Sequence, residues 1–427
     1  MLVYTDTEVL KIESVKFKII PVPINEEILL KFQRIDKYRN SVRYSTIGIY
    51  KDELYSVSTE IITNENGILD WLQQNHYDIG IAEFNVMAGS FAVFEALGIE
   101  ETFDVSCSVF VPQYLQFSEI KDLDYQFPEY SSAKPGDWVN GEWQKDGEEN
   151  EREHERINEW AHNTFIENSQ KSYNTLFNNY GISKNIKKPS PFDVLFKKIK
   201  YHFINQHPLI KFNDFPEHNK FVYIGGINVE VDKLLTEGKQ MVEDNEPDCV
   251  ILVTFGTAGY QTYPFGKMIK VFKYFSQCYF HVRANRTLQF GNGYTSEHPL
   301  PQREILSKTN TKVFISHCGI NSVTESMYAG VPLICIPKSG DQKYNASIVE
   351  SKGVGIYVDY EDLKDSTEFL GAALYQILNI DEEGNLNFNS KYTLAAEKMR
   401  NEILENYNPE TKKTMKDKFL GKFDGTN

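Results

Sequence analysis

The run CVILVTFGT, residues 249–257, is almost continuously apolar, rich in β-branched side chains, and closed by Phe-Gly-Thr. A strand with this pattern has no polar face, which is typical of a parallel strand covered by helices on both sides of its sheet. Strand-like and helix-like segments alternate after it, at residues 265–275, 278–284, 301–309, 312–319, 320–330, 332–337, 343–353 and 355–358. Short elements in this order predict a doubly wound, Rossmann-like α/β sheet.

The first half shows a weaker form of the same pattern. Strand-like runs at 17–22, 47–50 and 79–83 alternate with amphipathic stretches at 26–32 and 68–75, as expected of β/α units. The run YDIGIAEF predicts a buried strand, and the stretch after it, Phe91 to Leu97, predicts a helix that ends at Gly98. Phe84, Phe91 and Phe94 fit either a core or the wall of a cleft.

The length of 427 residues exceeds what a single hydrophobic core usually serves, so we expect two domains. The segment 229–247 is polar and charged, and it predicts a linker between residues 1–228 and residues 248–427. Residues 128–170 form a charge-dense insertion that predicts an exposed loop and a solvated helix, and the polar tail from Phe388 predicts C-terminal helices. A ligand cleft between the two domains is therefore expected.

Composition excludes several kinds of partner. Lys and Arg number 45 against 60 Asp and Glu, and the net charge of −15 argues against a nucleic-acid partner. The five cysteines are scattered, so we predict unpaired, mostly buried thiols and no metal site. No apolar run approaches the roughly 18 residues of a membrane-spanning helix, and no signal-peptide pattern opens the chain. We interpret the sequons at Asn285 and Asn345 as chance occurrences.

The stretch KVFISHCGINSVTES places polar groups where a parallel strand meets a helix. Because ligands bind beyond the carboxyl ends of such strands, a turn at 317–319 faces that position. Gly319 lets the backbone approach an oxyanion closely. His317, Asn321 and Ser322 add donors suited to a diphosphate, and Glu325, one helical turn after Asn321, can accept hydrogen bonds from ribose hydroxyls.

The next strand, PLICIP, is followed by Asp341 and Gln342. A carboxylate beside an amide suits several sugar hydroxyls. We therefore predict that the diphosphate binds after the first of these strands and a sugar after the second.

These motifs carry a resemblance to a known family. Residues 301–355 are similar to the donor-binding signature of UDP-glucuronosyl and UDP-glucosyltransferases, mainly the animal members, and VILVTFGT, VYIGGIN and YDIGIAEFNVMAGSFAVFEALGI also fit. The resemblance implies two Rossmann-like domains (the GT-B architecture) and inverting, metal-independent transfer of a hexose to a hydroxyl of a small lipophilic acceptor. It implies no cofactor besides the UDP-sugar co-substrate.

The resemblance also assigns roles. It puts His317, Gly319, Asn321 and Ser322 on the diphosphate, Glu325 on the ribose, Gln302 on the uridine, Asp341 and Gln342 on the transferred sugar, and Thr257 near the phosphates. Pro299 stands where the family has a Trp that stacks on uracil. Glu83 matches the carboxylate that assists the family's catalytic histidine.

That histidine has no counterpart here, since no histidine precedes His76. We expect His76, His202 and His207 to be surface residues rather than replacement bases. We also expect the chain to lack the family's first β/α unit, signal peptide and C-terminal membrane anchor. The family suggests the endoplasmic reticulum membrane, and nothing predicts an oligomeric state. The alternative is a truncated or degenerate member that at most binds UDP-sugar.

Overall fold

The structure, a computed structural model, describes residues 2–5, 20–23, 67–120, 123–139, 141–163, 190–257, 260–411 and 413–423, with scattered residues between 164 and 189. The predicted elements at 26–32 and 47–50 lie outside the described residues. The chain divides into two compact units, and each contains segments that are not adjacent in sequence. The first comprises 1–124, 151–204 and 216–222, and the second comprises 125–150, 205–215 and 223–427. The predicted linker at 229–247 stays a prediction.

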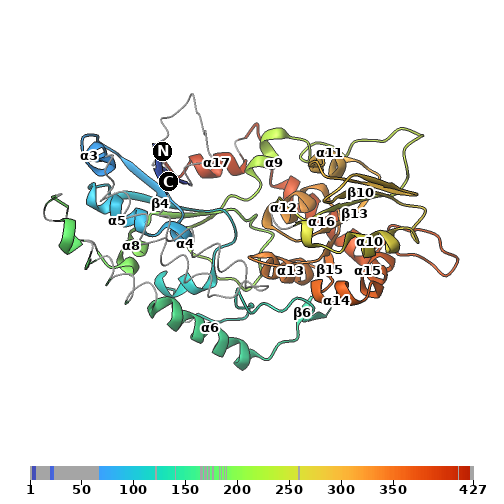
Figure 1. Ribbon diagram of the computed structural model, residues 1–427, viewed down its shortest axis with the longest axis horizontal. Helices are drawn as coiled ribbons and strands as arrows, with labels where there is room; N and C mark the ends of the chain where they lie inside the picture. Colours follow the sequence, from blue (N-terminus) through green and yellow to red (C-terminus); the bar gives the residue numbers. More distant parts are fainter. Residues whose placement is uncertain are drawn as a thin grey trace. The chain divides into compact units, whose positions relative to one another are not determined.

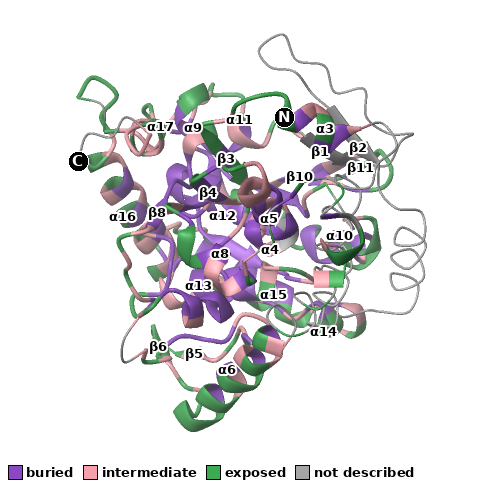
Figure 2. Ribbon diagram, turned by 90° about the vertical axis from the view of Figure 1, so that its left-hand side faces the viewer, coloured by how far each residue is buried: buried purple, intermediate pink, exposed green. Residues whose placement is uncertain are grey.

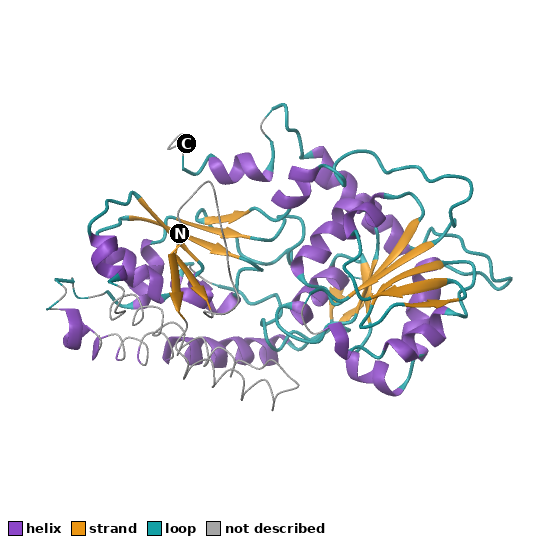
Figure 3. Cartoon of the chain, turned by 45° about the horizontal axis from the view of Figure 1, so that its top comes forward, coloured by secondary structure: helices purple, strands orange, loops and turns teal. Residues whose placement is uncertain are grey.

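The second unit contains a seven-stranded sheet, which Figure 3 shows in orange among purple helices. The strands follow the order β11-β12-β10-β9-β13-β14-β15, and their pairings are parallel except for that of β11 with β12. Their bounds are β9 Val250–Thr254, β10 Tyr279–Arg283, β11 Leu288–Phe290, β12 Gly293–Ser296, β13 Thr311–Ser316, β14 Leu333–Cys335 and β15 Gly355–Tyr357. The doubly wound parallel sheet predicted from the sequence is therefore present.

Helices pack on both faces of this sheet (Figure 1). The helix α12 packs against α11, α13 and the C-terminal α16. The helix α15 packs against α10 and α14. Their bounds are α9 Ile227–Asp232, α10 Phe265–Phe272, α11 Gln302–Ser307, α12 Ile320–Ala329, α13 Gln342–Ser351, α14 Tyr360–Asp365, α15 Glu368–Leu378, α16 Lys391–Glu405 and α17 Met415–Leu420. A short 3-10 helix covers Tyr260–Thr262.

The core of this unit lies between the central strands and the α10 and α15 layer. Ile251 and Val253 of β9 and Phe272 of α10 are among its fully buried side chains. Burial of such side chains contributes about 1.5–3 kcal/mol each. Figure 2 shows the buried residues gathered in the strands and α12, and exposed residues along α6 (Gly147–His162). The solvated helix predicted within the insertion is thus confirmed.

The first unit contains a four-stranded sheet in the order β3-β4-β7-β8, with bounds Ile79–Ala82, Glu101–Ser106, Tyr201–Ile204 and Phe221–Tyr223. The pairings of β3 with β4 and β4 with β7 are parallel. Its helices are α3 Ile68–Gln73, α4 Phe84–Met87, α5 Gly89–Ala96, the 3-10 helix η2 Pro112–Phe117 and α8 Phe192–Lys198. After α5, Gly98 adopts a positive φ of 74°, as the predicted helix end requires.

Smaller elements complete the described chain. The strands β1 Leu2–Thr5 and β2 Ile20–Pro23 form a parallel pair, β5 Trp138–Val139 and β6 Glu142–Trp143 form an antiparallel pair, and a π-helix covers Phe177–Gly181.

The prediction that YDIGIAEF forms a fully buried strand is wrong. Its strand, β3, alternates in burial, and the side chains of Ile79 and Ile81 are 42% and 49% exposed. Successive side chains of a strand point to opposite faces of the sheet, and the face of β3 that carries Ile79 and Ile81 meets solvent. In contrast, Phe84 and Phe91 are buried and pack against each other, which places them in the core.

The prediction of unpaired thiols is wrong for four of the five cysteines. Cys249 pairs with Cys278, and Cys318 pairs with Cys335, whereas Cys107 remains a thiol. Strand register explains the pairs. Cys249 and Cys278 directly precede the residues at which β9 and β10 align, and Cys335 aligns with Ser316, two residues before Cys318.

The prediction that His202 and His207 lie at the surface is also wrong, because they are only 1% and 3% exposed. His76 does lie at the surface, with its side chain 89% exposed.

The segment 125–150 packs on α13 within the second unit. The indole N–H of Trp138 donates to the hydroxyl of Ser347 at 2.7 Å, and the ring stacks on Phe212 with centroids 5.6 Å apart. The backbone N–H of Gly136 donates to the carboxylate of Glu350 at 2.6 Å. Part of the predicted insertion therefore stabilises a helix far away in the sequence.

Candidate functional site

Two turns at the carboxyl ends of neighbouring strands form the centre of the site. Ser316, the last residue of β13, aligns with Thr254, the last residue of β9, so the residues that follow each strand lie side by side. After β13 the chain passes through His317 to Gly319 and enters α12. No side chain caps the first turn of α12. Its amide groups are therefore available to an anion, which the helix dipole also favours.

The imidazole of His317 lies against the backbone of both turns. A Cβ atom built on Gly256 would lie 2.6 Å from Nε2 of His317, and one built on Gly319 would lie 2.7 Å from it. Gly256 also has a φ of 73°, which favours glycine by itself. Glycine at both positions is thus what lets the ring occupy this place. Burial lowers the pKa of His317 to about 4, so the ring is neutral at physiological pH.

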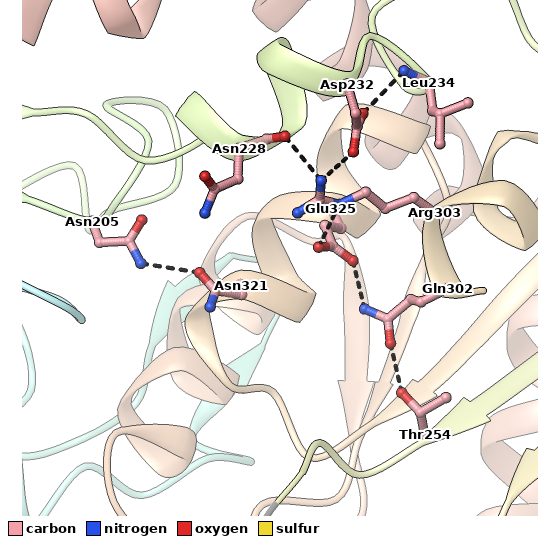
Figure 4. A network of polar contacts seen from close by, with 9 residues as sticks. All are labelled: Asn205, Asn228, Asp232, Leu234, Thr254, Gln302, Arg303, Asn321 and Glu325. Atoms are coloured by element: carbon pink, nitrogen blue, oxygen red, sulfur yellow. Dashed lines mark hydrogen bonds and ion pairs between the residues drawn. The ribbon is translucent and has the colours of Figure 1, made fainter. Parts of the chain in front are cut away.

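A chain of polar contacts leads from β9 through the first turn of α11 to the second turn of α12 (Figure 4). The hydroxyl of Thr254 donates to the amide oxygen of Gln302 at 2.7 Å, and the amide nitrogen of Gln302 donates to Glu325 at 2.6 Å. The second carboxylate oxygen of Glu325 accepts from Nε of Arg303 at 2.8 Å. Arg303 also pairs with Asp232 and donates to the carbonyl of Asn228. Glu325 is only 8% exposed, and these contacts fix its carboxylate.

Asp341 and Gln342 lie at the start of α13, directly after the loop that follows β14. The amide of Asn345 donates to Asp341 at 2.9 Å and to the carbonyl of Cys318 at 3.0 Å, which joins this loop to the turn after β13. The side-chain oxygen of Gln342 accepts from the backbone N–H groups of Lys338 and Ser339. Gln342 therefore holds its own loop in shape.

The structure brings most of the predicted residues together within the second unit. Asn321 accepts a hydrogen bond from Asn205 at 3.0 Å, Ser322 is buried in the first turn of α12, and Thr257 is exposed after β9. Glu83 belongs to the first unit, where the thiol of Cys107 contacts its carboxylate at 3.5 Å. Burial raises the pKa of Glu83, and the nearby Asp104 adds to the rise.

Four residues with clear structural roles were missed in the sequence: Thr254, Gly256, Arg303 and Asn345. Arg303 and Gly256 adjoin predicted residues, and only that proximity could have pointed to them. Thr254 carries no local signal, because its partner lies 48 residues away, and the bond from Asn345 to Cys318 spans 27 residues.

Comparison with known proteins relates this part of the chain to a known family. The family model described as "UDP-glucoronosyl and UDP-glucosyl transferase" matches residues 213–387, which include the site residues from Asn228 to Asn345 but not Asn205 or Glu83. This segment is similar to the UDP-glycosyltransferase family. A putative UDP-glucuronosyltransferase of Caenorhabditis elegans, ugt-46, is 31% identical over 195 residues, which are 43% of this chain and 35% of that protein. An ecdysteroid UDP-glucosyltransferase of Spodoptera littoralis nuclear polyhedrosis virus is 29% identical over 180 residues, which are 39% and 35% of the two chains.

The matched region thus spans about a third of the length of these UDP-glycosyltransferase relatives. Solved structures support the fold over more of the chain. The calicheamicin glycosyltransferase CalG4 superposes with a TM-score of 0.60 at 13% identity, covering 96% of this chain and 87% of that one. The kitacinnamycin glycosyltransferase gives a TM-score of 0.54 at 13% identity, covering 91% and 88%. The fold is α/β with two Rossmann-like domains, as the GT-B prediction stated. No helix among the described residues is both long and apolar enough to cross a membrane.

Proposed function

We propose that the chain transfers a hexose from a UDP-sugar to a hydroxyl group of a small lipophilic acceptor, with inversion at the anomeric carbon and without a metal ion. One observation supports the part of this proposal that concerns binding of the UDP-sugar. His317 is wedged between Gly256 and Gly319 beside the uncapped first turn of α12, with Glu325 one turn further along. The match of residues 213–387 to the UDP-glycosyltransferase family model supports the donor class.

The diphosphate would bind to the amides of the first turn of α12, with Asn321 and Ser322 beside it. A neutral His317 can donate one N–H to a phosphate oxygen without first losing a proton. As the bond to the sugar breaks, the helix dipole and this N–H would stabilise the departing UDP. These groups supply the charge stabilisation that a metal ion would otherwise provide.

The nucleoside would lie along the Gln302 and Glu325 pair. A carboxylate offers about four acceptor positions, and the side chains of Gln302 and Arg303 use two of those of Glu325. The remaining positions could accept the ribose hydroxyls while Arg303 keeps the carboxylate in place. Asp341 and Gln342, at the start of α13, would take the sugar, and Thr257 would lie near the phosphates.

A second candidate function is donor binding without transfer. The observation that favours it is the environment of Glu83, the carboxylate proposed to assist catalysis. The side chain of Glu83 contacts the thiol of Cys107, and a raised pKa makes this carboxylate a weaker partner for a protonated base. In that case the site would bind UDP-sugar and release no UDP.

We further propose an oxidising compartment, such as the lumen of the endoplasmic reticulum. The two disulfides support this, because such bonds persist mainly in oxidising compartments. The two sequons offer a check, because glycans are added in the secretory pathway. Asn285 is exposed. Asn345 is buried, and its side chain bonds Cys318 and Asp341, which leaves no room for a glycan. Expression with a secretory leader should modify Asn285 alone, and modification of Asn345 would contradict this environment.

The deciding experiment is calorimetric titration with UDP and UDP-glucose, followed by a UDP-release assay with a set of phenols. His317→Ala and Glu325→Ala should each weaken UDP binding about tenfold or more. His281→Ala is the control, because His281 lies on β10 and contacts Tyr294 instead. UDP release that needs an acceptor supports transfer, and binding without release supports the second candidate. Absence of UDP binding would contradict both.

A further inference from the structure

A pocket of about 200 Å³ lies in the first unit, at the amino-terminal ends of β7 and β8. Its lining includes His202 of β7, Phe221 of β8, and residues 218–220 just before β8. Glu83 and Cys107 follow the opposite, carboxyl ends of β3 and β4. Because parallel α/β sheets bind their substrates at the carboxyl ends of the strands, this pocket is separate from the position expected for an acceptor.

A buried imidazole and carboxylate pair forms one wall of the pocket. Nδ1 of His202 lies 2.8 Å from Oδ2 of Asp104, and Oδ1 of Asp104 accepts from the backbone N–H of Phe84 at 2.8 Å. His202 is 1% exposed and Asp104 6% exposed. The carboxylate therefore fixes the orientation of the ring, as such partners do for other histidines. Among the described residues, Nε2 of His202 has no hydrogen-bond partner.

The lining also contains several basic side chains. Lys197, His218 and Lys220 line the pocket with His202, against a single acidic side chain, Glu119. Burial lowers the pKa of His218, and the charges of Lys220 and His202 lower it further. Burial also lowers the pKa of Lys220. These basic groups repel one another in a partly desolvated space, so an anion placed among them would be stabilised.

The remaining walls are aromatic and define the shape of a ligand. The rings of Phe117, Phe196 and Phe221 line the pocket, and that of Phe196 lies 4.5 Å from the imidazole of His202. The volume is below the roughly 300 Å³ at which pockets for drug-sized ligands begin, which limits the occupant to about one ring. Aromatic walls favour a flat ring, which can contact their faces and edges.

We propose that this pocket is a second ligand site, for a small aromatic carboxylate whose acidic group binds between His202 and Lys220. His202 lines this pocket although it is only 1% exposed. The ammonium groups of Lys197 and Lys220 line the same pocket. The site is independent of the proposed transfer reaction, because its residues lie outside the candidate donor site.

Sodium benzoate is the probe, measured by calorimetric titration of the full chain at neutral pH and by NMR of the histidine ring carbons. We expect saturable binding with a dissociation constant at or below about 1 mM, equivalent to about 4 kcal/mol. The ring signals of His202 and His218 should move. Benzyl alcohol, which has the ring without the charge, and acetate, which has the charge without the ring, should each bind at least about tenfold more weakly.

Lys220→Gln and His202→Gln should each weaken benzoate binding about tenfold. The matched control is Lys200→Gln, since Lys200 pairs with Glu101 and does not line the pocket. If His202→Gln does not fold, judged by near-ultraviolet circular dichroism, Lys220→Gln alone carries the test. Equal losses in the Lys200 and Lys220 variants, equal binding of benzyl alcohol, or displacement of benzoate by UDP would each overturn the proposal. The last result would move the ligand to the donor site.

Discussion

Nε2 of His317 occupies space that a side chain at residue 256 would need, because a Cβ built on Gly256 would lie 2.6 Å from that nitrogen. Gly256→Ala should therefore displace the imidazole and weaken UDP binding about tenfold or more. The positive φ of 73° adds about 1–2 kcal/mol of strain for any L-residue. Gly353→Ala is the matched control, because its φ is 66° and no atom lies within 4 Å of the added Cβ. Calorimetric titration with UDP should separate the two variants, and equal losses would mean that strain alone is responsible.

Arg303 pairs with two carboxylates, Glu325 and Asp232, and each of them can be replaced separately. Glu325→Gln removes a charge from the proposed ribose position but leaves Arg303 paired with Asp232. We expect it to weaken UDP binding about tenfold, as loss of a charged hydrogen-bond acceptor usually does. Asp232→Asn removes the other partner of Arg303 without touching the Gln302 and Glu325 pair, and should change UDP affinity less than about threefold. An equal effect of both substitutions would show that Glu325 acts through stability alone.

Protonation of His317 should destabilise the fold in mild acid. Its pKa falls from 6.5 in the unfolded chain to about 4 in the folded protein, so folding must release a proton below pH 6.5. Stability from this group is fully present above pH 6.5 and is lost as the pH falls toward 4, by about 3 kcal/mol in all. Urea denaturation between pH 7.5 and 4.5 should show a shallower pH dependence for His317→Gln. His76→Gln, which changes an exposed ring, should retain the wild-type slope.

The bond from Trp138 to Ser347 should account for part of the stability of α13. Trp138→Phe keeps an aromatic ring next to Phe212 but removes the indole donor. We expect a loss of about 1 kcal/mol and a melting temperature lower by about 2–4 °C. Trp143→Phe changes the ring that stacks on Trp138 at 5.9 Å without affecting the bond to Ser347, so it should cost less. A larger loss for Trp143→Phe would contradict this role of Trp138.

The two disulfides should differ in their effect on the donor site. Cys318 lies between His317 and Gly319, whereas the Cys249–Cys278 bond joins the beginnings of β9 and β10. Replacing either pair with Ser should reduce stability by about 3 kcal/mol, typical of loops of this length. Only the Cys318 and Cys335 replacement should also weaken UDP binding. Peptide mapping without reductant should first recover both pairs, and recovery of four unmodified thiols would contradict the arrangement.

The parts of the fold that were predicted correctly are those with local signals. The strand β9 has an uninterrupted apolar run, and the helix α5 ends where Gly98 supplies a positive φ. The errors depend on neighbours that are distant in sequence. The exposure of Ile79 follows from the uncovered face of β3, and the disulfides follow from strand register. The burial of His202 follows from Asp104, 98 residues away.

The candidate site divides in the same way. His317 and Gly319 lie in the turn between β13 and α12, and Glu325 lies in α12. The order of strand, turn and helix in one short segment predicts how these residues lie together. In contrast, the contact of Gly256 with His317 needs the register between β9 and β13. The position of Asn345 needs the pairing of β13 with β14. The pattern of a single segment does not indicate which other strand that segment pairs with.

The second unit is assembled from three separate segments of the chain, and this has a consequence for the expression of fragments. A fragment that starts at the predicted linker would contain α13 but would lack Trp138, Tyr130 and Phe212, which belong to the same unit and pack around that helix. The buried ring of Tyr344, which contacts Tyr130 and Phe212, would then meet water. Such a fragment should be poorly soluble when expressed alone. Supplying residues 125–150 and 205–215 as a second polypeptide should restore its solubility.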